Sequence, residues 1–566
     1  MAEETSARQD RADDVKWWHT AVIYQVYPRS FADANGDGIG DLPGITSRLD
    51  HVAALGADAV WLSPFYRSPQ RDAGYDVSDH CDVDPLFGTL ADFDALVARA
   101  HELGLRVIVD VVPNHSSSEH RWFQEALAAG PGSPERARYI FREGRGDGSL
   151  PPNNWESVFG GPAWTRVTEA DGRPGQWYLH LFDSSQPDFD WTNPEVEAHF
   201  EDVLRFWLER GADGFRIDVA HGLVKADGLP DWHPAGVAAT AASAPEDDGI
   251  VHVEASMSSM GPMWAQEGVH DIWRRWRSLV SSYGEDRVLV AEAWVEPLAD
   301  TAKWVRPDEL HQAFNFPFLM TRWDADALRA VIDESLAVFG AVGAPATWVL
   351  SNHDVIRHPM RLALPVPIPH GDGIGPTTPQ RPDPAVAWRR GRAATLLMLA
   401  LPGSAYLYQG EELGLPEVIE LPDEARQDPT FRRTHGEKYG RDGCRVPLPW
   451  DSDAPAFGFS PTGASWLPQP AEWGAHAASA QDGVPGSSLE LYRAALRLRR
   501  ELRIAHGELT WLEAPPGVLR FRVGAVEVVA NVAGEAVSVE GREVLLRSVG
   551  SGPVLERDAA AWLTAE

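Results

Sequence analysis

The chain has 566 residues, of which 44% are hydrophobic, so it can bury a large core and form more than one domain. Acidic residues outnumber basic ones, 83 to 50, and the net charge of −33 argues against binding to nucleic acid or to an anionic membrane surface. No apolar run reaches the roughly 20 residues of a membrane helix. The first residues lack the apolar segment of a secretory signal, which predicts a cytoplasmic protein. Cys81 and Cys444 allow one disulfide at most, and the sequence gives no special support for it.

Eight short apolar runs recur along the chain, separated by helical patterns and loops. The runs are AVIYQVYP from Ala21, AVWLSP from Ala59, VIVDVVPNH from Val107, GFRIDVA from Gly214, VLVAEAWV from Val288, HQAFNFP from His311, TWVLSNHD from Thr347 and AYLYQGEEL from Ala405. Their nearly continuous apolar character predicts parallel strands that are buried on both faces. Amphipathic helices between them, such as LADFDALVARAHELG, end in glycine as helix C-termini often do. This alternation predicts an α/β fold, the (β/α)8 TIM barrel.

Three irregular segments modify this barrel. Residues 116–191 are rich in Gly, Pro, Trp and Asn and are too long for an ordinary loop, which predicts an inserted subdomain after the third strand. A second irregular stretch, about 226–268, is predicted to cross the same face. Short β-rich pieces with turn signals follow from about Ile504 and predict a small all-β domain at 504–566. The barrel itself is therefore assigned to residues 1–115 and 192–503.

Polar residues gather at the C-terminal ends of several predicted strands. They are Asn114, His115, Arg216, Asp218, Glu292, His353 and Asp354. In a barrel of this class, those ends converge on one mouth, where active sites lie. Cleavage of a glycosidic bond needs two carboxyl groups, one to protonate and one to attack or to activate water. Asp218 and Glu292, at the ends of the predicted fourth and fifth strands, are the candidates for this pair.

The neighbours of the two carboxyl groups suggest different roles. Arg216 lies two residues before Asp218, on the same face of the strand, and would hold Asp218 ionised as a nucleophile requires. Glu292 is flanked by two alanines and Trp294, and these less polar neighbours predict the raised pKa of a general acid. A retaining mechanism further predicts that the two carboxyl groups lie about 5–5.5 Å apart.

Four segments carry a family resemblance. The runs DVVPNHSS, DGFRIDVA, VAEAWV and SNHD occur in order on the third, fourth, fifth and seventh strands, and they resemble the four signature segments of the α-amylase family, glycoside hydrolase family 13. The resemblance covers most of the chain, including the insertion and the terminal β domain. It implies that Asp218 is the nucleophile, Glu292 the acid/base and Asp354 a residue that helps to distort the bound sugar. The residues that it places around that sugar are His115, Arg216 and His353.

Further segments resemble the oligo-1,6-glucosidase and α-glucosidase branch of this family. They are QVYPRSFADANGDGIGDLPGI, DAGYDVSDH, FGGPAWT, GQWYLHLF and GRDGCRVPLPW. The resemblance implies that Asp72 and Tyr75 belong to the terminal glucose pocket and that Arg445 joins Asp72 at the hydroxyls farthest from the scissile bond. Phe159 would add an aromatic wall. A pocket closed at that end predicts an exo-acting α-glucosidase that releases glucose from short, neutral α-glucosides.

The preferred linkage and the fate of the glucosyl intermediate stay open. Val219 follows the nucleophile, as in members of this branch that favour α-1,6 bonds, but the next stretch, AHGLVKADGLPDW, departs from the oligo-1,6-glucosidase pattern. Linkages α-1,2, α-1,3, α-1,4 and α-1,6 all remain possible. A transglycosylase, a sucrose phosphorylase or an isomerising synthase would use the same intermediate. A non-catalytic relative would predict a transmembrane helix and lost carboxylates, and the sequence shows neither.

Oxygen-bearing residues alternate in one loop near the N-terminus. They are Asp33, Asn35, Asp37, Ile39 through its backbone carbonyl, and Asp41. This is the first part of a calcium loop, although an EF-hand would need Glu at the twelfth position, where the chain has Gly44. In the resembling glucosidases such a loop holds a structural Ca²⁺, or sometimes Mg²⁺, away from the reaction centre. We therefore expect a structural Ca²⁺ and no organic cofactor; the alternative is an Asp/Asn/Gly turn without a metal.

Overall fold

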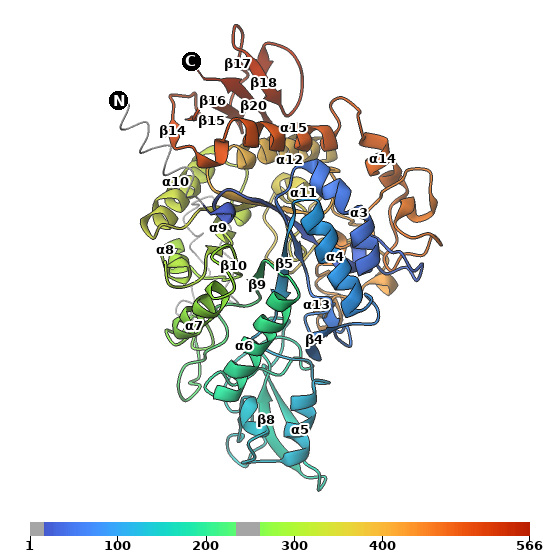
Figure 1. The fold of residues 1–566 in the computed structure, drawn as a ribbon, viewed down its shortest axis with the longest axis vertical. Coiled ribbons are helices and arrows are strands. Elements are labelled where there is room, and N and C mark those ends of the chain that lie inside the picture. The colour runs from blue at the N-terminus through green and yellow to red at the C-terminus, as the bar shows by residue number, and fades with distance from the viewer. Residues whose placement is uncertain (1–15, 234–260, 566) are drawn as a thin grey trace.

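The computed structural model describes residues 16–233 and 261–565. All eight predicted barrel strands are present: β1 (Val22–Val26), β2 (Ala59–Leu62), β5 (Arg106–Val111), β9 (Gly214–Ile217), β10 (Val288–Ala291), β11 (Gln312–Ala313), β12 (Thr347–Val349) and β13 (Ser404–Tyr408). They form one sheet in the order β11-β10-β9-β5-β2-β1-β13-β12, and every paired neighbour is parallel. The predicted (β/α)8 barrel is therefore confirmed (Figure 1).

Helices surround this sheet and bury their apolar faces against it. The longest are α3 (Leu42–Leu55), α4 (Leu90–Glu102), α6 (Pro194–Glu209), α7 (Val269–Ser281), α10 (Ala325–Ala341), α12 (Pro384–Leu399) and α15 (Ser488–Glu501). In α4 a capping box joins Thr89 and Asp92 at the first turn, and Phe93, Leu96 and Ala100 share the buried face. Such helices explain why the strands are buried on both sides, which allows their continuous apolar sequences.

The inserted segment after β5 builds a small sheet of its own. It contains α5 (Arg121–Ala129) and three antiparallel strands in the order β6-β8-β7, namely β6 (Phe141–Arg142), β8 (Pro174–Leu179) and β7 (Trp164–Thr168). The buried Arg136 joins Glu169 at 2.7 Å within this segment. These elements all lie between residues 116 and 191, at one end of the molecule (Figure 1). Arg433, from the barrel side, reaches Asp183 of the segment at 3.0 Å.

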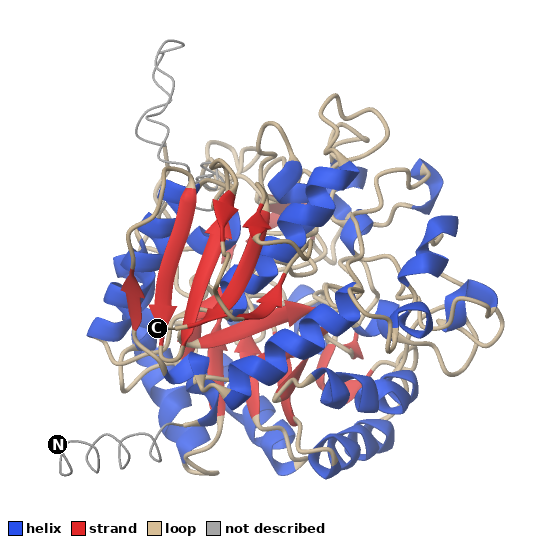
Figure 2. Ribbon diagram, turned by 90° about the horizontal axis from the view of Figure 1, so that it is seen from above, coloured by secondary structure: helices blue, strands red, loops and turns tan. Residues whose placement is uncertain are grey.

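The C-terminal residues form a five-stranded antiparallel sheet. Its order is β14 (Leu509–Trp511), β15 (Val518–Val523), β16 (Val526–Asn531), β20 (Ala559–Thr564) and β18 (Val544–Arg547). The sheet lies at the end of the molecule opposite the inserted segment, and Figure 2 shows its strands side by side with helices around them. Trp562 of β20 is fully buried and donates from Nε1 to the Leu396 carbonyl of α12 at 3.0 Å.

Three general predictions can be compared with this fold. Within the described residues, no helix is long and apolar enough to cross a membrane. Both cysteines are unpaired. Of the irregular stretch at about 226–268, residues 234–260 lie outside the described residues, but Leu229 contacts Asn153 of the inserted segment through its carbonyl at 3.1 Å.

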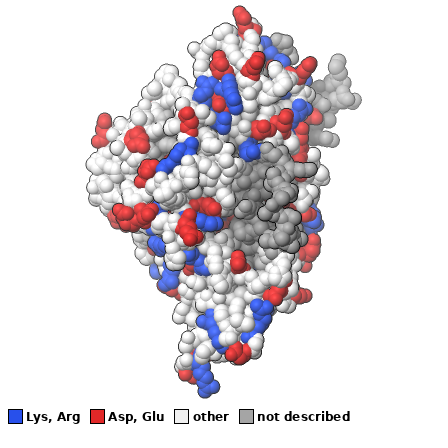
Figure 3. All heavy atoms as spheres, turned by 180° about the vertical axis from the view of Figure 1, so that it is seen from behind, with Lys and Arg blue, Asp and Glu red and all other residues white. Residues whose placement is uncertain are grey.

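On the face that Figure 3 shows, acidic and basic side chains of the described residues are interspersed.

Candidate active site

A cavity of about 290 Å³ lies at the C-terminal ends of the barrel strands. Its lining includes the predicted residues Asp72, Tyr75, His115, Phe159, Asp218, Glu292 and Asp354. A larger cavity of about 850 Å³ is lined by Met360, Trp388 and prolines, and its lining within the described chain contains none of the predicted residues. Paired carboxyl groups are what glycoside chemistry needs, so the smaller cavity is the candidate active site.

Arg216 lies beside this cavity and connects the two predicted catalytic carboxyl groups. Its Nη1 donates to Asp218 Oδ1 at 2.6 Å, and its Nη2 lies 2.9 Å from Glu292 Oε2. A third carboxyl group, Asp110 of β5, accepts from Nη1 at 3.0 Å. The parallel register explains this meeting, because Arg216 of β9 stands level with Asp110 on one neighbouring strand and Val290 on the other. One guanidinium therefore faces three buried acids.

The surroundings of Glu292 are more polar than its flanking sequence indicates. Glu292 accepts hydrogen bonds from the Val219 backbone N–H at 2.9 Å and from Trp294 Nε1 at 3.0 Å. Burial alone would raise the pKa of Glu292, but the Arg216 charge and the Val219 N–H outweigh it, and the pKa is lowered. The predicted raised pKa of Glu292 is wrong in this arrangement, because its partners come from another strand.

Asp218 shows the opposite shift. Burial raises the pKa of Asp218 well above its ordinary value, and the neighbouring charges of Glu292 and Asp110 add to this effect against Arg216. The prediction that Arg216 holds Asp218 ionised is therefore wrong in this arrangement, because the same guanidinium also contacts Asp110 and Glu292. Burial raises the pKa of Asp110 to about 7. Groups that interact this strongly titrate as a unit, and this unit holds its proton to a higher pH than an isolated aspartic acid does.

Asp354 remains a carboxylate next to these groups. It lies 2.8 Å from Arg445 Nη2 and 2.9 Å from Arg441 Nη1, and His353 Nε2 is 3.2 Å away. Burial would raise the pKa of Asp354, but His353 and the two guanidinium groups outweigh burial and lower it far below the usual range. The Tyr75 ring stacks on His353 with ring centres 5.2 Å apart. Asp354 can therefore accept hydrogen bonds from sugar hydroxyls as an anion.

The predicted pairing of Asp72 with Arg445 needs correction. Asp72 Oδ1 accepts from Arg441 Nη2 at 2.9 Å, and its Oδ2 accepts from Gln186 Nε2 at 3.0 Å. Arg445 lies behind this wall, where its Nε donates to the His353 carbonyl at 2.8 Å. Both arginines stand in the segment GRDGCR, and only the first reaches the cavity lining. Burial raises the pKa of Asp72 to about 6, although Arg441 opposes the shift.

The other predicted pocket residues lie where the inserted segment meets the barrel. His115 lies 3.2 Å from the Tyr75 carbonyl through Nε2, and burial lowers the pKa of His115 to about 4, so its ring is neutral. The Tyr75 hydroxyl donates to Asp110 Oδ2 at 3.1 Å. Phe159 comes from the inserted segment, packs against Phe182 and faces the Arg441 guanidinium at 5.3 Å. The inserted segment thus supplies an aromatic part of the pocket wall.

Sequence reasoning missed several residues of this site. Asp110 begins the motif DVVPNH, and its fully buried carboxyl group contacts Arg216. His221 lines the cavity, and its ring stacks on Trp264 with ring centres 4.9 Å apart. The buried Lys225 follows in the same loop. His221 and Lys225 stand in AHGLVKADGLPDW, the stretch that departs from the oligo-1,6-glucosidase pattern. This departure was the signal in the sequence that could have identified them.

Lys225 ties that loop to the end of the third barrel strand. Its Nζ lies 2.8 Å from Asp188 Oδ2 and donates to Asn114 Oδ1 at 2.8 Å. The Asn114 side chain in turn lies beside His115, with 3.2 Å between Nδ2 and Nδ1. This buried network fixes the backbone that carries His115 into the site.

The loop of the predicted metal ligands is closed by backbone amides. Asp33 accepts from Gly36 and Gly38, and Asp41 accepts from Gly44 at 2.6 Å and thereby caps α3. The side-chain oxygens of Asn35 and Asp37 each accept a backbone N–H two residues later. Asp41 Oδ2 also accepts the backbone N–H groups of Ala34 and Asn35, both at 3.1 Å. All the side-chain atoms that could bind a metal here are oxygens, which Ca²⁺ prefers, and an oxygen that accepts a single N–H keeps a second lone pair. The donor set fits a hard divalent cation.

A barrel with paired carboxyl groups at the C-terminal ends of its strands has the catalytic groups of a glycoside hydrolase in the place where such barrels carry active sites. The model of the alpha-amylase catalytic domain matches residues 25–507, and the chain therefore belongs to the α-amylase family. A probable alpha-glucosidase of Rhizobium meliloti (strain 1021) is 39% identical over 543 residues, which are 92% of this chain and 89% of that protein.

Two solved structures are similar over nearly the whole chain. The alpha-glucosyl transfer enzyme XgtA is 35% identical with a TM-score of 0.81, and the match covers 98% of this chain and 100% of that one. The trehalulose synthase MutB from Pseudomonas mesoacidophila MX-45 is 30% identical with a TM-score of 0.79, and the match covers 97% of this chain and 99% of that one.

Proposed function

We propose that the protein is a retaining, exo-acting α-glucosidase. The observation that carries the proposal is the meeting of Asp218 and Glu292 on one guanidinium beside a single cavity. In a retaining mechanism one carboxylate attacks the anomeric carbon while an acid protonates the departing oxygen, and water then hydrolyses the glycosyl–enzyme. Asp218 is the proposed nucleophile, and Glu292 is the proposed acid and, in the second step, the base.

The shared charge environment supplies the proton for the first step. The raised pKa of Asp218 holds a proton on the coupled carboxyl groups to a higher pH than an isolated aspartic acid would. The reaction needs that proton on Glu292 and a negative charge on Asp218. A bound glycoside favours this arrangement, because its glycosidic oxygen accepts a proton from Glu292 and the positive charge that develops on the sugar ring attracts the Asp218 carboxylate.

The ion pair between Asp72 and Arg441 supports attack at a chain end. Asp72 is buried at the pocket wall, the Arg441 side chain is 11% exposed, and the two are joined at 2.9 Å; Asp354 contacts the other guanidinium nitrogen of Arg441 at 2.9 Å. Charged groups in such a fixed position can accept hydrogen bonds from, and donate them to, the hydroxyls of one terminal glucose, as an exo-acting enzyme requires. The proposed substrates are small, neutral α-glucosides.

Product analysis tests this function directly. Purified enzyme is incubated with a panel of α-1,2, α-1,3, α-1,4 and α-1,6 glucobioses and sucrose, and the anomer formed first is followed by NMR. We expect glucose, released first as the α-anomer, and loss of this activity in Asp218→Asn. Release of the β-anomer would contradict the retaining mechanism, and absence of glucose from every substrate would contradict the hydrolase itself. The panel also decides the linkage.

A glucosyltransferase or isomerising synthase is the second candidate. The observation in its favour is the similarity to an alpha-glucosyl transfer enzyme and to a trehalulose synthase over nearly the whole chain. Both activities would use the same Asp218 intermediate and differ only in what intercepts it. The ratio of transferred to released glucose, measured as substrate concentration rises and with phosphate present or absent, separates them from hydrolysis. A ratio well above one at low substrate concentration would favour transfer as the main reaction.

We also propose that the loop from Asp33 to Asp41 holds a structural Ca²⁺, with Mg²⁺ as the alternative ion. The side chains of Asp33, Asn35, Asp37 and Asp41 and the Ile39 carbonyl would hold it. When bound, the ion would neutralise the acidic side chains and fix the loop before α3. The support is the oxygen-only donor set and the alternating positions described above. A cytoplasmic location remains a prediction, which the two unpaired cysteines favour.

A further inference from the structure

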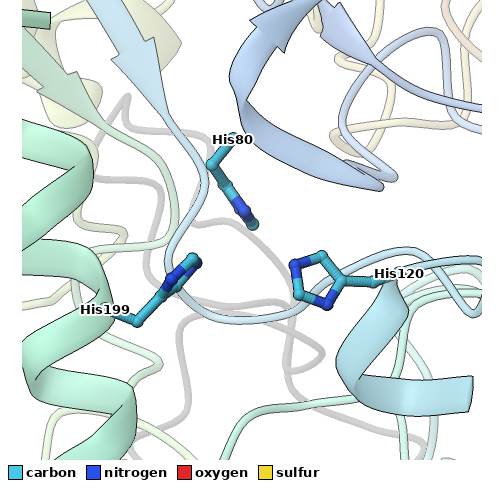
Figure 4. A group of neighbouring side chains, drawn as sticks. All are labelled: His80, His120 and His199. Carbon is cyan, nitrogen blue, oxygen red and sulfur yellow. The ribbon is translucent and has the colours of Figure 1, made fainter. Parts of the chain in front are cut away.

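Three histidines from three separate elements point toward one another outside the active site (Figure 4). His80 lies on β4 (Asp79–Val83), His120 caps the N-terminus of α5, and His199 belongs to α6. One ring nitrogen of each lies within 4.8 Å of those of the other two. His80 and His120 are buried and His199 is half-buried. These elements belong to the barrel and to the inserted segment, so the cluster lies where the two meet.

Two of these rings have a buried nitrogen without a hydrogen-bond partner among the described residues. His80 Nε2 lies 3.2 Å from the Val112 carbonyl and donates to it, which leaves the lone pair on Nδ1. Nδ1 of His80 and Nε2 of His199 are buried and have no hydrogen-bond partner within the described chain. A buried polar atom without a partner is costly, and in native structures it calls for a water or an ion. The orientation of His80, with one nitrogen on a carbonyl and the other free, is typical of a histidine that binds a metal.

His120 can complete the set. In Figure 4 its Nε2 faces the other two rings, while Nδ1 accepts the Trp122 backbone N–H at 3.1 Å. A metal on Nε2 would require the ring proton to lie on Nδ1. The Tyr139 hydroxyl oxygen, 3.4 Å from Nδ1, is placed to accept that proton in exchange for the Trp122 bond. Metal binding would therefore change the tautomer of His120 and release the Trp122 N–H.

The electrostatic surroundings keep the three rings in the neutral form that binds metals. Burial lowers the pKa of His120 to about 3 and that of His199 to about 4, and burial together with the other two histidines lowers the pKa of His80 well below its ordinary value. The charges that face the cluster have both signs. Asp79 and Asp202 act on His199 in favour of a cation, and Arg121 and Arg138 act against it.

We propose that His80, His120 and His199 form a Zn²⁺ site, with a water as the fourth ligand. Three imidazole nitrogens with an open position are a common zinc ligand set, and imidazole also suits Co²⁺, Ni²⁺ and Cu²⁺. The site would join β4, the start of α5 in the inserted segment, and α6 of the barrel. Its role is structural: the Val112 carbonyl, which accepts from His80, lies three residues before His115, which lines the active-site cavity. The metal therefore fixes the base of the inserted segment.

Cobalt titration tests the site, because tetrahedral Co²⁺ is coloured and can replace zinc. The full-length enzyme is stripped with a chelator, supplied with Ca²⁺ so that the Asp33–Asp41 loop is filled, and titrated with Co²⁺. We expect one equivalent with the visible bands of tetrahedral Co²⁺, which added Zn²⁺ bleaches. Zn²⁺ should also raise the melting temperature.

Matched variants separate this site from accidental binding. His199→Gln, at the half-buried position, should weaken Co²⁺ binding by at least about 100-fold, since losing even an outer-shell partner costs about 10–100-fold. His506→Gln removes an exposed histidine elsewhere, and Asp37→Ala alters the calcium loop; both should bind Co²⁺ like the wild type. Glucosidase activity of each variant reports that it has folded. Absence of tetrahedral bands, or equal binding by His199→Gln and the wild type, would overturn the proposal.

Discussion

Arg216 contacts the carboxyl groups of Asp110, Asp218 and Glu292, so one positive charge faces three acids. Fully ionised, this group would carry a net negative charge in a buried place, and burial therefore keeps a proton within it. The sequence places Arg216 and Asp218 on one face of a strand, but it does not show how many acids share the guanidinium. The proton count of the group, more than the pKa of any single member, decides when the enzyme is active.

This proton count predicts a basic limit to activity. Because the pKa of Asp218 is raised, the group loses its proton only at a higher pH than an isolated aspartic acid, and kcat/KM should fall as the pH rises through that raised value. Glu292→Gln removes the acid and should lower kcat/KM about 10²–10⁴-fold for disaccharides. The loss should be much smaller for an aryl α-glucoside whose leaving group needs no proton. A Glu292→Gln variant that keeps the basic limb of the wild type would contradict the assigned role of Glu292.

Arg441 carries the next prediction at this scale. Arg441→Ala should lower kcat/KM by about 10- to 100-fold, since a hydrogen bond between the sugar and a charged group contributes about 1.5–3 kcal/mol. The reason is that Asp72 and Asp354 would both lose a guanidinium partner at the pocket wall. Steady-state kinetics on the preferred disaccharide measures the effect.

Arg381→Ala is the matched control for Arg441→Ala. Arg381 is 40% exposed, pairs with Glu420 at 2.9 Å and lies outside the lining of the active-site cavity. An exposed ion pair contributes little, so kinetics and stability should stay close to the wild type. If Arg441→Ala is as active as Arg381→Ala, the ion pair with Asp72 has no part in holding the sugar.

At the scale of elements, the sequence predicted what local pattern determines. The eight strands follow from apolar runs, and Asp218 and Glu292 follow from their positions at strand ends. Long-range pairings were not accessible in this way. Asp72 and Arg441 are 369 positions apart and lie on loops, so no periodicity distinguishes Arg441 from Arg445. His80, His120 and His199 likewise come from three elements that meet only in the folded chain.

The loop before α3 predicts a calcium-dependent stability. Asp37 is exposed and accepts one hydrogen bond from the Ile39 N–H, so its removal should disturb the metal-free fold little. A ligand at 100 times its Kd stabilises by about 2.7 kcal/mol, and Ca²⁺ should therefore raise the Tm of the wild type while a chelator lowers it. Asp37→Ala should lose this response. The same Tm for wild type in Ca²⁺ and in chelator would favour a turn without a metal.

At the scale of the whole molecule, the inserted segment and the C-terminal sheet lie at opposite ends of the barrel and have different relations to the site (Figure 1). The inserted segment contributes Phe159 and Phe182 to the cavity lining, whereas no residue of the described C-terminal sheet lines it. Substitutions in the inserted segment should therefore affect substrate binding. Substitutions in the C-terminal sheet should affect stability alone.

Trp562 allows this separation to be tested. It is fully buried in β20 and donates to the Leu396 carbonyl of α12, so Trp562→Ala should cost about 3–5 kcal/mol of folding free energy. Trp562→Phe keeps much of the packing, loses the N–H donor and should cost clearly less. Thermal unfolding measures stability, and kcat/KM at a temperature where each variant is folded measures the site. We expect a lower Tm with unchanged kcat/KM, since α12 carries the C-terminal sheet without reaching Asp218 or Glu292. A fall in kcat/KM at full folding would show that the C-terminal sheet helps to shape the active site.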